Sequence, residues 1–357
     1  MTPIPLFGHT AVRRRLESAV ERGTLPASLL LHGPAGIGKQ RLALWLGQRL
    51  LCDGPPPRPC GKCQQCRYAE AGTHPDLRWI FPRPRLKDSN PTAADVFADH
   101  GEAVAERVAA HGLYAAPPGN EGIYIATIRA IVQSAAMAPA LAARKVFVIG
   151  DAERMVSQDG ADQAANAFLK LLEEPPADTN VVLTSSEPGA LLPTIRSRVI
   201  AVRMSRLTDV EVGALLDDER VRDYLREQSV SGDRSELLRT AGGAPGVLLA
   251  QSTLGNAMAR ARRMLEAASG DRVTRLHTAF VQGSARARGE FADALQALTV
   301  LLHERTRAAL ASADEEAAVR AARAADAVER AKERAAGNGN PQLVTFTLLG
   351  ELEAALR

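Results

Sequence analysis

The chain is poor in lysine and in aromatic residues, and it contains no long apolar run. Six of its 357 residues are lysines, although lysine and arginine together number 44, and aromatic residues make up 4%. No apolar stretch approaches the ~20 residues that a membrane helix needs, and arginines at 13–15 interrupt any signal-peptide core. We therefore expect a cytoplasmic protein. Because lysine is rare, each lysine is a candidate for a chemical role.

The net charge is small as well. With 44 basic and 41 acidic side chains the chain carries +3 at pH 7, which is too little to indicate a broad nucleic-acid surface. Any DNA contact must be local or shared with other chains. Hydrophobic residues at 46% and charged residues at 24% exclude a disordered tail protein and a collagen-like repeat. At ~100–200 residues per domain, the length predicts two or three domains.

Short apolar runs alternate with helical stretches in the first 205 residues. Each run is bounded by Gly, Pro or polar residues, as expected of buried parallel strands. The runs that we interpret as strands are 28–31, 77–81, 146–149, 181–184 and 199–202. The pattern predicts an α/β domain at 1–205, with a five-stranded parallel sheet that binds ligands at the carboxyl ends of its strands.

The chain becomes helical after residue 205. Strand-like runs disappear, and apolar residues recur at helical spacing, as in Phe291, Leu295, Leu298 and Leu302. A break at 242–245 leads us to expect a small helical domain at 206–254 and a larger one at 255–357. Within the first domain, residues 85–122 read as an insertion with one short helix, to which we assign no function.

A strand, a glycine-rich loop and a helix follow one another at residues 28–51. The loop contains Gly33, Gly36, Gly38 and Lys39, and its glycines allow the backbone to aim N–H groups at an anion above a helix N-terminus. A compact ammonium fits between phosphates better than the planar guanidinium that this chain otherwise prefers. We predict that these four residues form a phosphate-binding loop; a chance glycine-rich turn is the alternative.

Both groups that would hold Mg²⁺ beside this loop are missing. The lysine should be followed by a short hydroxyl residue, but Gln40 stands there, and Gly150 follows the third strand where an acidic ligand should be. Asp151 could serve only if the strand end slipped by one residue, which would turn every side chain to the opposite face. The pattern predicts weak ATP or ADP binding without a Mg²⁺ hydrolysis site, or a relic loop that holds nothing or a stray anion.

All four cysteines lie close together, with the spacing C-x7-C-x2-C-x2-C. They are Cys52, Cys60, Cys63 and Cys66. In a reducing cytoplasm disulfides are not expected, and two-residue gaps let successive thiolates turn toward one metal ion. Four thiolates complete a tetrahedron and leave no position for water, so we predict structural Zn²⁺. An iron–sulfur cluster or free thiols are the alternatives, and His74 is not needed as a ligand.

Polar groups and arginines flank the last two predicted strands. The fourth strand ends in Thr-Ser-Ser-Glu at 184–187, beside the proposed phosphate site, and the loop at 191–198 carries Arg196 and Arg198 into the fifth strand. Loop arginines are usually solvated. A guanidinium at such a rim can instead reach a neighbouring subunit's nucleotide and stabilise the charge that develops on its γ-phosphate.

Four motifs in this order resemble the AAA+ subunits of the bacterial clamp loader. They are the phosphate loop at 33–39, the four-cysteine module at 52–66, NAFLKLLEEPP at 166–176 and PTIRSR at 193–198. Three departures make the chain similar to a non-hydrolysing subunit rather than to the ATPase subunit gamma/tau: Gln40, Gly150 and the lack of an arginine at 242–247. Val199 is a further departure, because the family often has Cys there.

The resemblance implies a hetero-oligomeric loader that places the sliding clamp of DNA polymerase III on primed DNA. This chain would be a rigid end piece without ATPase or polymerase activity of its own. Arg198 would act in trans as an arginine finger on ATP held by gamma/tau, and the helices after 255 would join a collar. The implied partners are the gamma/tau and delta subunits, with clamp and DNA contacted through the complex. An active gamma/tau-like ATPase and a zinc-bearing DNA-binding adaptor remain open.

Overall fold

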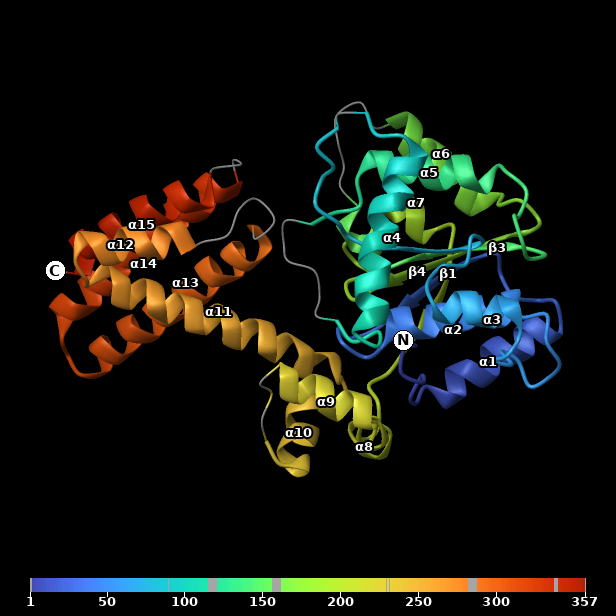
Figure 1. Ribbon diagram of the computed structural model, residues 1–357, viewed down its shortest axis with the longest axis horizontal. Helices are drawn as coiled ribbons and strands as arrows, with labels where there is room; N and C mark the ends of the chain where they lie inside the picture. The colour runs from blue at the N-terminus through green and yellow to red at the C-terminus, as the bar shows by residue number, and fades with distance from the viewer. Residues whose placement is uncertain are drawn as a thin grey trace. The chain divides into compact units, whose positions relative to one another are not determined.

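The computed structural model describes residues 2–88, 90–114, 121–155, 162–228, 230, 232–281, 288–336 and 340–356. The chain divides into two compact units, the first extending to Leu249 and the second beginning at Ala250 (Figure 1). No helix in these described ranges is both long and apolar enough to cross a membrane.

The first unit is built on a parallel sheet of five strands. The strands are β1 (Ser28–His32), β2 (Leu77–Ile80), β3 (Lys145–Ile149), β4 (Thr179–Ser185) and β5 (Ile200–Arg203). Their order across the sheet is β2-β3-β4-β1-β5, and all neighbouring pairs are parallel. The five strands and the parallel sheet expected from the sequence are therefore confirmed, and β1, which lies between β4 and the edge strand β5, leads directly into the glycine-rich loop.

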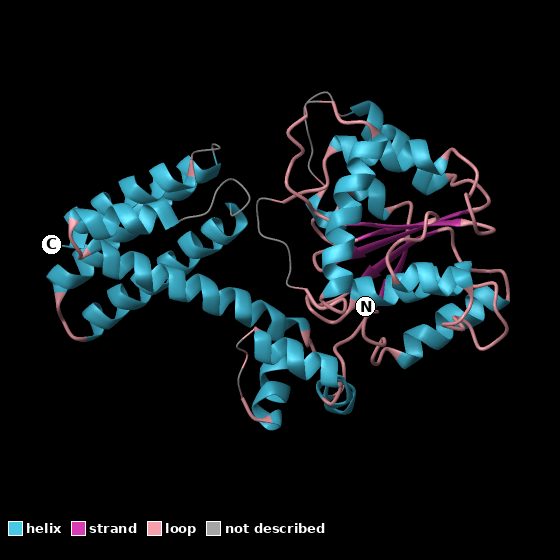
Figure 2. Cartoon of the chain, viewed as in Figure 1, coloured by secondary structure: helices cyan, strands magenta, loops and turns pink. Residues whose placement is uncertain are grey.

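Helices cover both faces of this sheet (Figure 2). The helices of the first unit are α1 (Thr10–Glu21), α2 (Lys39–Leu51), α3 (Gln64–Glu70), α4 (Ala93–Ala109), α5 (Ile125–Ala135), the 3₁₀ turn η1 (Ala152–Arg154), α6 (Asp162–Glu173), α7 (Pro193–Arg196), α8 (Asp209–Leu216), α9 (Glu219–Glu227) and α10 (Arg234–Ala241). Successive residues of β1 enter different cores: Leu29 and Leu31 pack with α1, α2 and α4, whereas Leu30 packs with α5 and α6. This alternation follows from the two-residue period of a strand.

The insertion contains a longer helix than the sequence analysis expected. Helix α4 has 17 residues and begins with a capping box, in which the Thr92 hydroxyl oxygen accepts from the Asp95 N–H and the Asp95 carboxylate accepts from the Thr92 N–H. Its buried residues Val96, Ala103 and Val104 lie in the sheet unit. The capping box satisfies the first free N–H groups, and burial of one face supplies the remaining stabilisation, so the segment is an integral layer of the fold.

The second unit is entirely helical in its described residues. It contains most of α11 (Gly246–Ala268), followed by α12 (Arg272–Val281), α13 (Arg288–Ala311), α14 (Glu315–Ala336) and α15 (Pro341–Leu356). The apolar stripe expected in α13 is buried against α14 and α15 in one core. Helices α8–α10 lie within the first unit. The domain boundaries at 205 and 254 stay predictions.

A buried carboxylate ties the segment before β3 to the segment before β2. The Asp76 side chain is 2% exposed and accepts backbone N–H bonds from Ala140, Leu141 and Ala142 at 2.6, 2.7 and 2.8 Å. Burial opposes ionisation, but the three N–H donors outweigh it and lower the pKa of Asp76. The carboxylate therefore fixes the start of two neighbouring strands.

We expect Asp76→Asn to destabilise the first unit by about 2–3 kcal/mol, because an amide cannot accept all three bonds and leaves buried N–H groups unpaired. Since the folded pKa lies below the unfolded value of about 4, this contribution is present above pH ~4 and is lost as the pH falls through the folded pKa. Urea unfolding followed by tryptophan fluorescence measures it, because both tryptophans, Trp45 and Trp79, lie in this unit. The exposed Asp223→Asn is the control; equal effects would refute the proposed anchor.

Candidate phosphate site and metal centre

The glycine-rich loop connects the carboxyl end of β1 to the first turn of α2. Gly36 and Gly38 have φ values of +77° and +92°, which side chains rarely tolerate, so glycine is required for the curled path. Lys39 is the first residue of α2. The loop thus brings backbone and an ammonium together at a helix N-terminus, as the sequence predicted.

The Lys39 ammonium makes three hydrogen bonds within the protein. It donates to the carbonyl oxygens of Gly33 at 3.0 Å and Pro34 at 2.8 Å, and to the Ser186 hydroxyl at 2.8 Å. Burial lowers the pKa of Lys39, while the nearby carboxylates of Asp151 and Glu153 oppose this shift. Because an ammonium has three protons, a phosphate must replace existing partners to bind it.

The first turn of α11 is in direct contact with the loop. The Gly246 N–H donates to the Gly36 carbonyl at 2.9 Å, and a Cβ added at Gly246 would lie 2.6 Å from the Gly36 Cα. The backbones of the two glycines are therefore in contact, and a side chain on either residue would force the neighbouring backbone to move. The sequence at 242–245 predicts only a break between helices, since a tertiary contact of this kind leaves no local pattern.

The residues on the metal side of the loop do not fit Mg²⁺. The Gln40 Nε2 donates to Asp151 Oδ2 at 3.0 Å, and its Oε1 accepts from the Trp79 indole N–H at 2.8 Å. Both ends of the amide are thus engaged by protein, and the residue after Lys39 offers no hydroxyl to ligate a cation. Asp151 reaches this position through a left-handed backbone at φ 49°, not through the strand slip considered above, because β3 ends at Ile149.

The four cysteines meet at one point, between the end of α2 and the start of α3. Their Sγ atoms all lie within 4.8 Å of one another, with 3.8 Å between Cys63 and Cys52 and 4.0 Å between Cys60 and Cys66. Ligands about 2.3 Å from a tetrahedral Zn²⁺ would be about 3.8 Å apart. This geometry fits a closed four-thiolate site and can hold a metal ion such as zinc.

Backbone N–H groups support the sulfur atoms. The Cys60 Sγ accepts from the N–H groups of Lys62 at 3.4 Å and Cys63 at 3.3 Å, and these bonds lower the pKa of Cys60 to about 6. His74 is not directed to the metal centre, since its Nε2 bonds Gln65 Oε1 at 2.8 Å and its Nδ1 accepts from the Asp76 N–H. All the ligands therefore come from the cysteines, in keeping with their spacing.

Arg198 lies at the edge of the sheet opposite the phosphate loop. It precedes β5, whose first residue pairs with Leu29 of β1, whereas the loop follows the other end of β1. At ~3.3 Å per strand residue, the two sites are separated by roughly 15 Å or more. The Arg198 Nε forms an ion pair with Glu173 Oε2 at 3.0 Å and Nη1 donates to the Thr194 carbonyl at 3.1 Å. This guanidinium cannot serve the chain's own loop.

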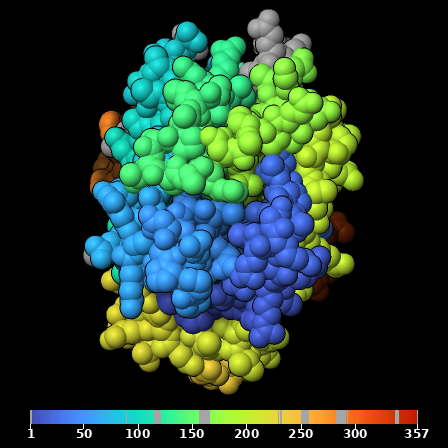
Figure 3. Space-filling view, turned by 90° about the vertical axis from the view of Figure 1, so that its right-hand side faces the viewer, coloured from blue at the N-terminus to red at the C-terminus, as the bar shows by residue number. Residues whose placement is uncertain are grey.

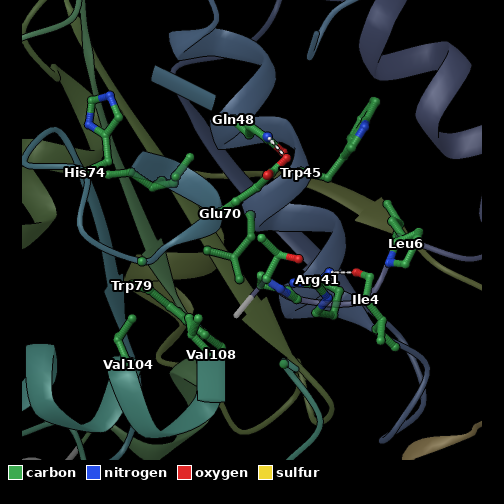
Figure 4. A pocket seen from close by; sticks show the side chains of 18 of the residues that line it. Ile4, Leu6, Arg41, Trp45, Gln48, Glu70, His74, Trp79, Val104 and Val108 are labelled. Carbon is green, nitrogen blue, oxygen red and sulfur yellow. Dashed lines mark hydrogen bonds between the residues drawn. The ribbon is translucent and has the colours of Figure 1, made fainter. Parts of the chain in front are cut away.

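A separate cavity of 380 Å³ lies beside α2 (Figure 4). Arg41, Trp45 and Gln48 project into it from one face of the helix, and Arg41 donates to the Ile4 carbonyl while Gln48 donates to Glu70. None of its lining residues belongs to the 33–39 loop. In Figure 3 the blue surface of the N-terminal segment lies between green surface and the yellow surface of α8–α10 within this unit.

Fold and site together define a class of protein. A parallel α/β sheet in which an inner strand runs into a glycine-rich loop and a buried lysine is the arrangement of phosphate-loop domains. The family model described as "DNA polymerase III, delta subunit" matches residues 8–208, more than half of the chain. The chain belongs to this family.

Curated relatives carry matching descriptions. The chain is 36% identical over 172 residues to the DNA polymerase III subunit delta' of Pseudomonas aeruginosa, covering 48% of this chain and 40% of that one. It is 30% identical over 238 residues to the subunit delta' of Escherichia coli, covering 66% and 57%. It is also 30% identical over 194 residues to the subunit gamma/tau of Mycobacterium tuberculosis, covering 54% and 27%. The chain thus spans about half the length, or less, of these relatives.

Proposed function

We propose that the chain acts as the delta' subunit of a clamp loader, as a stator that does not hydrolyse ATP. The observation that carries this proposal is the Gln40 amide, which hydrogen-bonds Trp79 and Asp151 on the metal side of the loop. Without an anchored divalent cation the charge on a transferring phosphoryl group is not neutralised, and hydrolysis is not supported. The role within the complex is structural.

The same proposal gives Arg198 a function in trans. Its place at the sheet edge remote from the loop, with a side chain 30% exposed, is suited to the ATP site of an adjacent gamma/tau subunit. Zn²⁺ held by Cys52, Cys60, Cys63 and Cys66 would fasten the segment between α2 and α3. The gamma/tau and delta subunits are the proposed partners, with the sliding clamp and primed DNA engaged through the assembly.

Assembly of the complex and its ATP turnover together test this proposal. We expect the purified chain to form a stable complex with the gamma/tau and delta subunits, and the complex to hydrolyse ATP when DNA is added. The isolated chain should release phosphate from ATP and Mg²⁺ at the rate of buffer alone. Failure to join the complex would refute the stator role.

The similarity to gamma/tau keeps an active ATPase as the second candidate. This function requires the isolated chain to hydrolyse ATP faster than buffer alone. The ATPase activity must also elute together with the protein from a sizing column. A zinc-bearing DNA adaptor would instead bind DNA tightly alone, with an affinity that falls steeply as salt rises. The same preparation thus separates all three functions.

A further inference from the structure

Gln40 and Gly150 fit against each other. A Cβ added at Gly150 would lie 2.3 Å from the Gln40 Cδ and 2.4 Å from both its Nε2 and its Oε1, distances that real Cβ atoms do not show. Gly150 does not adopt the left-handed φ that favours glycine elsewhere in this unit. The Gln40 side chain, and not the backbone, is therefore what requires glycine at this position.

The Gln40 side chain is held in one orientation. It is 6% exposed, its Nε2 faces the Asp151 carboxylate, and its Oε1 faces the Trp79 indole N–H. Exchanging the two ends of the amide would place a donor against a donor and an acceptor against a carboxylate. Moving the side chain away would leave a buried indole N–H without this partner, so the amide is a fixed part of the site.

A partly buried arginine brings positive charge to the same amide. Arg107 comes from α4, and its guanidinium carbon lies 3.3 Å from the ring centroid of Phe81, 3.8 Å from that of Tyr114 and 4.9 Å from that of Trp79. Its Nη1 donates to Gln40 Oε1 at the long distance of 3.5 Å. Stacking on aromatic faces holds the cation beside the amide, whose other end bonds the Asp151 carboxylate.

We propose that Gln40 and Arg107 together fill the position beside the phosphate loop that a divalent cation would take, and we call this pair the Gln40–Arg107 plug. Gln40 supplies the volume, Arg107 brings positive charge to the Oε1 end of the amide whose Nε2 end bonds Asp151, and Gly150 makes room. The proposal rests on the non-hydrolysing role proposed above and gives it a physical cause. The two departures, Gln40 and Gly150, are then one coupled change, and restoring either residue alone cannot restore a metal site.

A double-mutant cycle tests the steric part. We expect Gly150→Ala to lower the melting temperature of the first unit, read by tryptophan fluorescence, by roughly 5 °C or more in the presence of Gln40. In the Gln40→Ala background the same substitution should lower it by less than about 2 °C, because the new methyl group then has space. If Gly150→Ala alone fails to fold, a folded double variant supports the proposal. Equal shifts in both backgrounds, or an unfolded double variant, would overturn it.

A second cycle tests the role of the charge. Arg107→Met keeps most of the side-chain volume but removes the cation, and we expect it to lower the melting temperature. In the Asp151→Asn background, the same substitution should lower the melting temperature by at most about half as much. A purely packing role for Arg107 predicts no rescue, and that result would remove the charge from the proposal. These cycles measure stability, so they do not depend on assembly of a loader.

The effect of Mg²⁺ on nucleotide binding provides a functional test of the plug. A fluorescent ATP analogue is titrated into the full chain with either Mg²⁺ or EDTA present. We expect Mg²⁺ to produce no gain in binding, whether the analogue binds weakly or not at all. Binding that tightens tenfold or more with Mg²⁺ would show an open cation position and overturn the plug, even if the chain still joined the loader.

Discussion

We expect the replacement of Arg198 by alanine to lower the DNA-stimulated ATP turnover of a loader reconstituted with gamma/tau and delta, with about 10³-fold as the upper scale for a lost arginine finger. The chain should keep its fold, because Arg198 is partly exposed and its ion pair with Glu173 is of the kind that contributes little to stability. The loss should appear in turnover, while assembly with the other subunits and the melting temperature stay unchanged.

The chain offers a matched control for this experiment. Arg196 lies at the end of α7, two residues away and exposed, in the same loop. Arg196→Ala removes an equal charge, so it should lower turnover far less if position, and not net charge, is what matters. Arg198→Lys should recover only part of the turnover, since a point charge lacks the planar fork of a guanidinium. Equal effects of Arg196→Ala and Arg198→Ala would argue against a finger.

Glu173 has a role of its own in this interpretation. Its carboxylate holds the Arg198 Nε at 3.0 Å at the end of α6, so the proposed finger role requires the guanidinium to exchange this partner for a phosphate of the neighbouring nucleotide. A carboxylate 57% exposed is well hydrated, and releasing the arginine from it costs little. The ion pair can therefore orient Arg198 in the free chain without preventing its use in a complex.

Features set by local sequence were predictable. The five strands followed from apolar runs bounded by polar residues, and the curled loop between β1 and α2 from the glycine spacing around Lys39; its binding of phosphate stays a prediction. Positive φ at Gly36 and Gly38 is a property of the loop itself, so the motif carries it. The cysteine spacing likewise placed four sulfur atoms at one point, because two-residue gaps constrain the chain locally.

Features that depend on contacts between distant segments were not predictable. Arg107 lies in the insertion to which no function was assigned, and only the packing of α4 brings it to Gln40. The contact between Gly246 and Gly36 joins residues more than 200 positions apart. Asp151 was judged by strand register, whereas a left-handed turn after the strand decides where its carboxylate lies. A single sequence contains no periodic signal for any of these arrangements.

We expect removal of the proposed Zn²⁺ to unfold the segment between α2 and α3 and to destabilise the first unit by several kcal/mol, because four metal–thiolate bonds would hold this segment in place. We expect one zinc per chain by metal analysis of untagged protein. Chelation under reducing conditions should expose this segment to protease and lower the melting temperature, and added zinc should reverse both changes. Less than half an equivalent of zinc after careful purification would argue against the site.

Two substitutions distinguish a four-cysteine site from one that uses histidine. Cys60→Ser should lose zinc, since a serine hydroxyl is a poor replacement for a thiolate, and Cys60 is not fully buried, so the change itself disturbs little packing. His74→Gln should keep a full equivalent, because both ring nitrogens of His74 are engaged by Gln65 and Asp76. Zinc lost from the His74 variant while the Cys60 variant retains it would reverse the assignment. An absorption band of an iron–sulfur cluster in freshly purified protein would replace zinc with the alternative cofactor.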